Sequence, residues 1–371
     1  MIYRDAELHN VHELLAGDGP SVIGAGTLAA LREQGADPDA VWGAEDGEGL
    51  WFTRIPNELR LRLNVAAQLN ALQSTGAELR FNLHGPEARL ALKCQQAPVV
   101  VEVYQGSFLM SWHWIGRQRT EVVIRPPAKL GLLAQLSAAR RLPFDARLTR
   151  VLLPWRPPAR LLDFAADCTP PRREQTPRRR YLAYGSSITH GNASVRPSGM
   201  YAHRVAQLLG ADLINLGLGG GAHLEPAMAD YIAGRQDWDF ASLELGINLL
   251  RRVGPEQFAR LVDYFVERIA TAHPDRWIFC IDLFTVEEDL CGQPQAEEFR
   301  RIVRDKVAAL GLPRLVHVSG TELLVSVHGL TVDLVHPSPF GMEEIARGLV
   351  ARMRASMDSH QPGDAEPAPP G

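Results

Sequence analysis

Residues 181–191 read YLAYGSSITHG and decide the fold of the second half of the chain. The apolar run at residues 181–184 predicts a buried strand, and Gly185 permits a tight turn at its end. The next two residues, Ser186 and Ser187, carry hydroxyl groups that a neighbouring base could activate as nucleophiles. Serine is also a common turn residue after a strand, so this interpretation needs support from elsewhere in the chain.

Strand and helix patterns alternate from residue 181 onward. Apolar runs typical of buried strands lie at residues 181–184, 212–218, 240–245, 277–284 and 314–318. Apolar side chains from Phe258 to Ile269, and again from Met342 to Met353, recur with the period of an amphipathic helix. Alternation of this kind predicts a parallel α/β sheet with helices on both faces, and we assign residues 181–358 to this domain.

The first half of the chain has the two-residue period of half-buried strands. Such runs lie at residues 59–65, 79–83, 89–94, 99–104, 108–114, 120–124 and 148–153. Turn signals such as His84-Gly85-Pro86 separate them, and a helix is expected around residues 26–34. Many short strands with few helices predict an antiparallel β-sandwich of jelly-roll type over residues 1–168.

Two segments lack apolar periodicity. Residues 169–180, TPPRREQTPRRR, are rich in proline and arginine, which predicts an exposed linker and leaves an anion patch as the alternative. Residues 359–371, SHQPGDAEPAPPG, are rich in proline, and we expect a disordered tail. Because the linker is short, we also expect the sandwich to pack against the second domain and to close part of its pocket.

Composition limits the functions to consider. The chain has 371 residues, of which 46% are hydrophobic and 22% are charged, and its formal net charge is -4. These values indicate a soluble globular protein without a nucleic-acid partner. The N-terminus lacks the apolar segment of a signal peptide and no stretch predicts a membrane span, so we expect a cytoplasmic protein. The cysteines are widely spaced and are expected to be buried, reduced thiols: Cys94, Cys168, Cys280 and Cys291.

Polar or glycine-rich loops follow the predicted strands, where a parallel sheet gathers its chemistry. Ser187 follows the first strand, and the second strand runs into NLGLGGG at residues 215–221. Asn248 follows the third strand, and the loop before the last helix contains Asp333 and His336. We therefore expect these groups to meet along one edge of the sheet.

These residue types suit acyl transfer through a serine. A serine hydroxyl is a weak nucleophile until a base accepts its proton, and a neutral imidazole such as that of His336 is a suitable base near pH 7. Asp333 would hold the histidine in the required tautomer and stabilise its protonated form. The backbone N–H groups of Ser187 and Gly220 and the side-chain amide of Asn248 are candidate donors to the oxyanion of the tetrahedral intermediate.

In this order the motifs resemble the four sequence blocks of the SGNH hydrolases, the GDSL esterase and lipase superfamily. The resemblance covers residues 178–358, and the preceding half looks like the β-sandwich domain of some bacterial members. It implies a flavodoxin-like catalytic fold, a catalytic triad of Ser187, Asp333 and His336, and an oxyanion hole formed by Ser187, Gly220 and Asn248. The usual GDS reads GSS here and the frequent GxND reads GINL, which leaves the subfamily and the substrate open.

Several nearby residues have competing interpretations. Ser186 is the rival nucleophile, although the family places the reactive serine third in its block. His190 and His223 are expected near the site, at its polar rim or in a structural role. Trp112 and Trp114 would share one face of a strand, where we favour packing in the core or between domains over a sugar-binding platform.

The sequence has no HExxH zinc motif, phosphate-binding P-loop or dinucleotide-binding glycine motif, so we expect neither a metal nor a cofactor. Our main hypothesis is a serine esterase that removes a short acyl group, with acetyl the first candidate, from a carbohydrate or another small polar metabolite. The short acyl group is implied by the resemblance. Two alternatives stay open: a GDSL-type acyltransferase that uses an alcohol acceptor, and a carbohydrate-binding protein with a vestigial hydrolase domain. The oligomeric state is not predicted.

Overall fold

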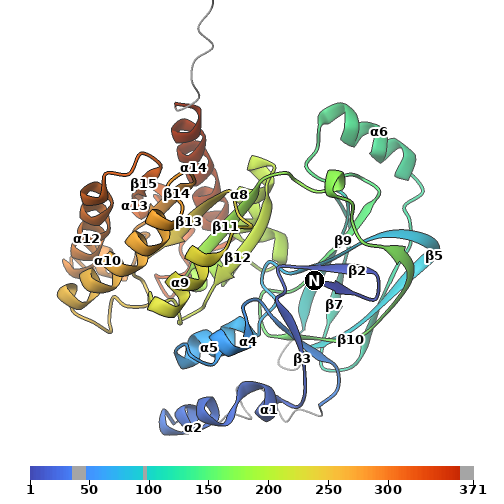
Figure 1. Cartoon of the computed structure of the whole chain (residues 1–371), viewed down its shortest axis with the longest axis horizontal. Coiled ribbons are helices and arrows are strands. Elements are labelled where there is room, and N and C mark those ends of the chain that lie inside the picture. The colour runs from blue at the N-terminus through green and yellow to red at the C-terminus, as the bar shows by residue number, and fades with distance from the viewer. Residues whose placement is uncertain (36–46, 95–97, 360–371) are drawn as a thin grey trace, which may run out of the picture.

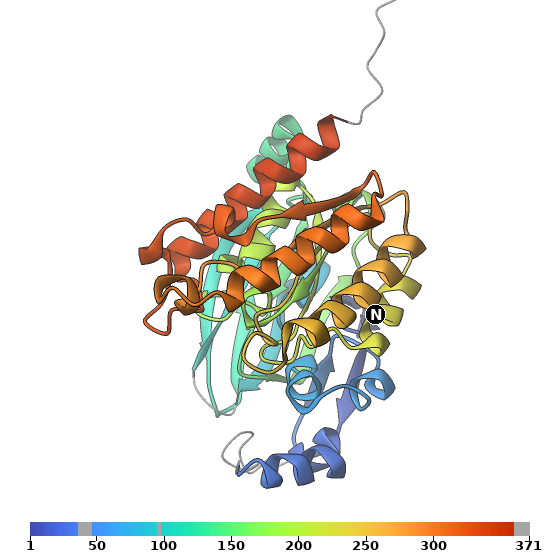
Figure 2. The same cartoon turned by 90° about the vertical axis from the view of Figure 1, so that its left-hand side faces the viewer.

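The computed structural model of the chain describes residues 1–35, 47–94 and 98–359. Within these ranges the first half forms an antiparallel β-rich part and the second half a parallel sheet, and the two lie side by side (Figure 1). Helices α1 (Gly19–Ile23) and α2 (Ala25–Glu33) lie at the opposite end of the molecule from the C-terminal end of α14 (Pro339–Asp358), as Figures 1 and 2 both show. The tail expected at residues 359–371 lies outside the described residues, apart from Ser359.

The parallel sheet contains all five predicted strands, in the order β12-β11-β13-β14-β15. The strands are β11 (Arg180–Gly185), β12 (Asp212–Gly217), β13 (Phe240–Glu244), β14 (Trp277–Ile281) and β15 (Leu315–Val318). Strand β11 lies between β12 and β13, so the order of the strands reverses at β11. The loops that leave the carboxyl ends of β11, β12 and β13 are therefore neighbours at this switch point, where α/β sheets bind ligands.

Helices cover both faces of this sheet, as predicted. Helices α8 (Tyr201–Leu209) and α14 pack on one face, and α9 (Pro226–Gly234), α10 (Pro255–Ala272) and α12 (Gln295–Leu310) pack on the other. Tyr181 faces the first group of helices and Leu182 the second, which explains why β11 is apolar at consecutive positions. Short helical segments lie in the loops: η1 (Arg173–Gln175), α7 (Ser187–His190), η2 (Pro197–Gly199), α11 (Glu287–Leu290), α13 (Gly320–Leu323) and η3 (Val327–Gly329).

The first half forms a 10-stranded antiparallel network. Its strands are β1 (Ile2–Tyr3), β2 (Ala6–His9), β3 (Glu13–Ala16), β4 (Leu50–Thr53), β5 (Glu78–Cys94), β6 (Val99–Gln105), β7 (Phe108–Ile115), β8 (Thr120–Ile124), β9 (Leu148–Leu152) and β10 (Ala159–Thr169). A helix, α6 (Leu130–Arg140), separates β8 from β9. The predicted strands at residues 99–104, 108–114, 120–124 and 148–153 are confirmed. Strands β1 to β4 and β10 were not predicted.

Strand β5 belongs to both layers of this β-rich part. Its first residues pair with β2 and β9, whereas residues 88–92 pair with β8, and β10 runs beside most of its length. Side chains from both groups of strands share one core, with Phe81 and Val151 meeting Leu90 and Val122. The turn predicted at His84-Gly85-Pro86 is therefore wrong, because the backbone continues as a strand and changes its partners instead of reversing.

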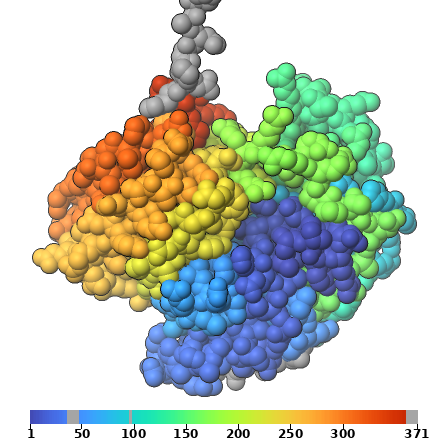
Figure 3. Space-filling model, viewed as in Figure 1, coloured from blue at the N-terminus to red at the C-terminus, as the bar shows by residue number. Residues whose placement is uncertain are grey.

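The strand predicted at residues 59–65 is also wrong. Helices α4 (Asn57–Arg60) and α5 (Val65–Ala71) occupy this region. Leu59 and Leu63 are buried four residues apart, which is the spacing of one helical face, whereas Leu61 is 47% exposed. Both buried leucines join the core of the parallel sheet rather than that of the β-rich part. Figure 3 shows the same contact, since the light-blue helices lie directly against the yellow segments of the second half.

The segment predicted as an exposed linker has exposed residues on either side of a buried anchor. Gln175 of η1 is buried and exchanges two side-chain hydrogen bonds with Asn82 of β5, at 2.9 and 2.6 Å. This amide pair anchors the segment to the β-rich part. The four cysteines are all free, and Cys94, Cys168 and Cys280 are buried as expected, whereas Cys291 is exposed.

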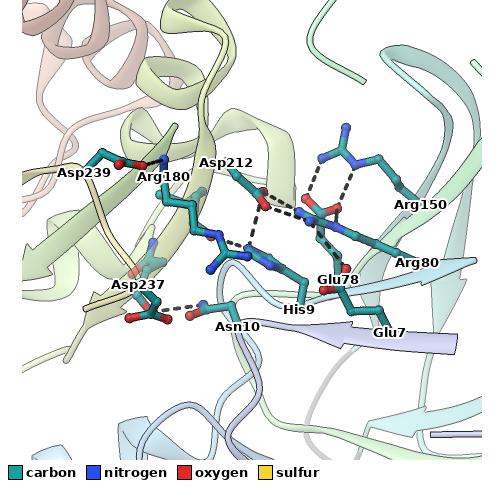
Figure 4. Close-up of polar contacts among 12 residues, drawn as sticks. Glu7, His9, Asn10, Glu78, Arg80, Arg150, Arg180, Asp212, Asp237 and Asp239 are labelled. Atoms are coloured by element: carbon teal, nitrogen blue, oxygen red, sulfur yellow. Dashed lines mark hydrogen bonds and ion pairs between the residues drawn. The ribbon is translucent and has the colours of Figure 1, made fainter. Parts of the chain in front are cut away.

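A buried network of charges joins the two halves (Figure 4). Arg80 of β5 donates to both carboxylate oxygens of Asp212, at 2.9 and 2.6 Å, and to Glu78 at 2.8 Å. Arg150 of β9 binds the same Glu78 at 2.8 and 2.5 Å. Burial alone would raise the pKa of Glu78 and Asp212, but Arg150 and Arg80 outweigh it and hold both pKa values below their ordinary range. Both carboxylates therefore stay charged and depend on arginine partners.

Candidate active site

Ser187 and His336 meet at the carboxyl edge of the parallel sheet. Ser187 begins α7 directly after β11, and His336 lies in the loop that precedes α14. The Ser187 hydroxyl lies 2.7 Å from Nε2 of His336, and Nδ1 of the same ring lies 2.6 Å from Oδ2 of Asp333. The structure thus brings the three predicted triad residues into one continuous chain of hydrogen bonds.

Asp333 is held by its own loop. Its Oδ1 accepts hydrogen bonds from the backbone N–H groups of His336 (2.9 Å) and Val335 (3.0 Å) and from the Thr331 hydroxyl (2.8 Å). Burial by itself would raise the pKa of Asp333, but these bonds, with those from His336 the strongest, hold the pKa well below its usual value. A permanently charged carboxylate keeps the proton on Nδ1 of His336, which leaves Nε2 free to accept the proton of Ser187.

Glu244, the last residue of β13, supports the serine turn, and the sequence analysis missed it. Its buried Oε2 accepts hydrogen bonds from the Ser186 N–H at 2.6 Å and from the Thr189 hydroxyl at 3.0 Å. A Cβ added at Gly185 would lie 2.3 Å from this oxygen, so only glycine fits at the end of β11. The sequence does contain a signal for it, a single acidic residue within the run FASLEL. A buried strand tolerates such a residue only when its carboxyl group is hydrogen-bonded.

Replacing Glu244 by alanine is expected to lower kcat by about tenfold to a hundredfold with little change in KM, because the serine turn loses its anchor and Ser187 shifts relative to His336. The measurement is steady-state hydrolysis of p-nitrophenyl acetate. Glu244→Gln is the matched variant, since its amide oxygen can still accept from Ser186, and it should retain most of the activity. Equal losses in both variants would contradict this positioning role.

The other two predicted oxyanion-hole residues, Gly220 and Asn248, line the same cavity as Ser187. Gly220 lies in the loop after β12, and a Cβ added at its neighbour Gly219 would lie 3.6 Å from Cβ of Ser187. The Asn248 side chain accepts a hydrogen bond from the Ala222 N–H at 3.1 Å, which leaves its NH2 group available as a donor. Gly220 and Asn248 line the same cavity as Ser187, so the arrangement can present N–H donors to an oxyanion formed beside the serine.

The cavity around Ser187 has a volume of about 570 Å³ and is lined by both halves of the chain. The second half supplies the catalytic edge. The first half supplies Asn70 of α5, Gln73 just after this helix, and Trp155 and Arg156 from the loop between β9 and β10. The expectation that the β-rich part closes part of the pocket is therefore confirmed. Sequence reasoning missed these four residues because nothing in their local pattern links them to a site whose catalytic groups lie between Ser187 and His336.

Arg54 ties this wall to the glycine loop. Its buried guanidinium donates to the carbonyls of Asn70 and Gln73 on one side and of Asn215 and Gly217 on the other, at 2.8 to 2.9 Å. Desolvation lowers the pKa of Arg54 to about 9. All four of these acceptors are backbone carbonyls, and none is a carboxylate. The four hydrogen bonds fix the pocket wall relative to the loop that carries Gly220.

Trp112 and Trp114 do not pack in a core or between the two halves, so the interpretation favoured from the sequence is wrong. They are 60% and 62% exposed on β7, a terminal strand of the sheet. Trp114 lines a second groove of about 380 Å³ together with Val195 and Pro197 of the second half. This groove shares Trp155 and Arg156 with the cavity around Ser187, so the two are neighbours.

The two histidines near the serine differ, because both ring nitrogens of His190 lie at hydrogen-bond distance from protein groups, whereas the buried Nε2 of His223 has no hydrogen-bond partner among the described residues. His190 is buried, with Nδ1 2.9 Å from the Gly217 carbonyl and Nε2 2.8 Å from the Gln73 amide oxygen, and burial followed by the charge of Arg54 lowers its pKa to about 3. It is therefore a neutral link between the halves. His223 does not line the cavity, and burial lowers its pKa as well.

Within residues 1–35, 47–94 and 98–359, no group of three or more histidine, cysteine, aspartate or glutamate side chains is placed to hold a metal ion. Over the same ranges, no helix combines the length and the apolar character that a membrane crossing requires. The groups gathered around Ser187 can carry out nucleophilic and general-base chemistry with their own side chains.

The fold and the site define a carboxylic ester hydrolase. Residues 183–344 match the model of the GDSL-like lipase/acylhydrolase family, and the chain therefore carries a domain of this family. The match spans the segment from β11 into α14 and contains all the predicted site residues. No curated protein matches the chain.

Solved structures share the fold. The salicylyl-acyltransferase SsfX3 from a tetracycline biosynthetic pathway aligns with 96% of this chain and 95% of its own, at a TM-score of 0.71 and 18% identity. A family two carbohydrate esterase from Clostridium thermocellum, solved with cellohexaose, aligns with 77% of this chain and 94% of its own, at a TM-score of 0.52 and 16% identity. An acetyl xylan esterase from the rumen bacterium Butyrivibrio proteoclasticus aligns with 76% of this chain and 90% of its own, at a TM-score of 0.50 and 14% identity. These similarities extend over both halves of the chain.

Proposed function

We propose that this protein is a serine esterase that hydrolyses short acyl esters, with acetyl the first candidate, of a carbohydrate or another small polar alcohol. The observation that carries the proposal is the unbroken chain of hydrogen bonds from the Ser187 hydroxyl through His336 to Asp333 at the wall of an open cavity. The carbohydrate esterases and the acetyl xylan esterase with this fold support the choice of substrate class.

In the proposed mechanism, Ser187 Oγ attacks the ester carbonyl carbon while its proton passes to Nε2 of His336. The negative charge that develops on the carbonyl oxygen is stabilised by N–H donors of Ser187, Gly220 and Asn248. His336 then returns the proton to the departing alcohol, and an acyl ester on Ser187 remains. A water molecule, deprotonated by the same histidine, attacks this ester, releases the carboxylic acid and restores the serine.

The proposal is tested with a fluorophosphonate probe that reacts with activated serines. We expect the intact mass of the protein to increase by one probe adduct, the adduct to map to Ser187 by peptide mass spectrometry, and prior boiling to prevent the reaction. Excess of a hydrolysable acetyl ester should slow the labelling. An unlabelled native protein, or an adduct on another residue, would overturn the proposed mechanism.

The groove beside Trp114 supports a ring-bearing alcohol part in the substrate, because an exposed indole face stacks on flat or ring-shaped groups. Trp114→Ala is expected to raise KM for an acetylated oligosaccharide by roughly fivefold to tenfold and to change p-nitrophenyl acetate hydrolysis less than twofold. Leu109→Ala, at an exposed position of the same strand outside the groove, is the matched control. A KM that stays the same for the oligosaccharide would argue against this use of the groove.

An acyltransferase is the second candidate, and the alignment of almost the whole chain with a salicylyl-acyltransferase favours it. Both reactions share the acyl-enzyme and differ in whether water or an alcohol attacks it. Adding alcohol acceptors during turnover and measuring new ester against free acid separates them. New ester in excess of acid would replace the hydrolase assignment.

A further inference from the structure

We propose that the substrate carries a negatively charged group, a carboxylate or a phosphate, which Arg156 and Arg252 bind inside the cavity around Ser187. The inference rests on the proposed function and specifies the chemistry of its substrate. Arg156 comes from the loop between β9 and β10, and Arg252 from the segment that follows Asn248, so each half of the chain contributes one arginine to the cavity lining.

Three arginines line the cavity, and they are not equivalent. Arg251 is held by carboxylates of the protein, with hydrogen bonds of 2.6 Å to Glu287 and to Glu288. In the part of the chain that the structure describes, neither Arg156 nor Arg252 has a hydrogen bond or an ion pair to a carboxylate. Two cationic side chains are therefore available to a ligand.

The remaining lining does not neutralise these charges. Glu288 is the acidic side chain among the described residues of the cavity wall, and Arg251 already binds it. Asn70, Gln73 and Asn248 are neutral amides, and His190 is neutral because its pKa is about 3. The cavity thus has an excess of positive charge in a chain whose formal net charge is -4.

The fields of both arginines reach the interior beside the site. Burial is the main cause of the lowered pKa of His190, with the charges of Arg54 and then Arg156 adding to it. Burial and then the charge of Arg252 lower the pKa of His223. A cleft with walls of low dielectric constant concentrates such a field, which attracts anions into it. Planar guanidinium groups match the paired oxygens of carboxylates and phosphates.

The test compares three acetate esters of para-substituted phenols that differ in the charge of the substituent: 4-acetoxybenzoate, 4-acetoxyphenyl phosphate and the neutral 4-acetoxybenzamide. Rates of hydroxide-catalysed hydrolysis correct for leaving-group reactivity. We expect kcat/KM for at least one anionic ester to exceed that for the amide by about tenfold at low salt, and this selectivity to fall as ionic strength rises. The carboxylate and phosphate arms identify which anion is preferred. A selectivity near one for both anions would overturn the proposal.

Arg156→Gln and Arg252→Gln should each lower the anionic-to-neutral ratio of kcat/KM by about threefold, and the double variant by about tenfold, because exposed charge pairs are partly screened. Arg156→Lys, which keeps the charge, should lose less than Arg156→Gln. Arg260→Gln, an exposed arginine of α10 outside the cavity, is the control and should keep the ratio. An unchanged ratio in the double variant would contradict the assignment. A protein that hydrolyses no ester at all would instead refute the proposed function.

Discussion

Replacing Ser187 by alanine is expected to reduce kcat for p-nitrophenyl acetate by about 10⁵- to 10⁶-fold, because the variant can no longer form the acyl-enzyme. The hydroxyl is the proposed nucleophile, and it already lies 2.7 Å from the base that would accept its proton. The folded state should persist, since removing one partly exposed oxygen breaks no contact in either core. Steady-state hydrolysis and thermal unfolding of the same preparation measure the two quantities.

Ser186→Ala is the matched control for this prediction. The Ser186 hydroxyl accepts a hydrogen bond from the Ile188 N–H at 3.1 Å and caps α7, and its side chain is buried. Losing such a cap costs about 1 kcal/mol of stability, so kcat should fall by no more than about tenfold. If Ser186→Ala were the inactive variant and Ser187→Ala the active one, the rival serine would be the nucleophile.

Replacing Arg80 by alanine is expected to lower the free energy of unfolding by about 3 to 5 kcal/mol, the usual result of removing one partner of a buried ion pair. Arg80 is 1% exposed and is the residue that donates to both oxygens of Asp212. Without it, the Asp212 carboxylate stays buried at the contact between the halves, with the imidazole of His9 3.4 Å away and largely neutral. Denaturant unfolding followed by fluorescence gives the difference.

Arg89→Ala is the comparison for Arg80. Its ion pairs with Glu87 and Glu121 are at the surface, where the Arg89 side chain is 50% exposed and solvent screens the charges, so its loss should cost far less stability than the loss of Arg80. Asp212 adds a pH test. Because its folded pKa is lowered, its stabilisation is present above the unfolded pKa near 3.9 and is lost as the pH falls through the folded value. Equal costs for the two arginine variants would contradict the structural role of the buried network.

The parallel sheet was predictable because its signals are local. Consecutive apolar residues, as at 181–184, indicate a strand that is buried on both faces. The helix from Phe258 to Ile269 repeats its apolar residues with one period over several turns. The β-rich half was harder. At residues 59–65 leucine and arginine alternate as in a strand, but Arg60 is buried and donates to the Val22 carbonyl, a partner that lies far away in the sequence. Local pattern cannot report such a contact.

The same distinction applies to the site. Ser187, Asn248, Asp333 and His336 follow strands or precede a helix, so their places on the sheet edge could be inferred from the order of elements. Trp155 and Arg156 reach the cavity because the loop between β9 and β10 contacts the second half, where the Trp155 carbonyl lies 2.9 Å from Nε2 of His190. Glu244 was overlooked for another reason. A carboxyl group at the end of a buried strand becomes informative only once the serine turn that it bonds is known.

Helices α4 and α5 have a consequence for how the chain matures. Leu59, Leu63, Ala67 and Ala71 precede the parallel sheet in the sequence, yet they are buried in its core. During synthesis these residues leave the ribosome long before β12 and β13 exist to cover them. The nascent first half therefore exposes an apolar helical surface until the second half has been made. Completion of that half both builds the catalytic edge and withdraws this surface from contact with other nascent chains.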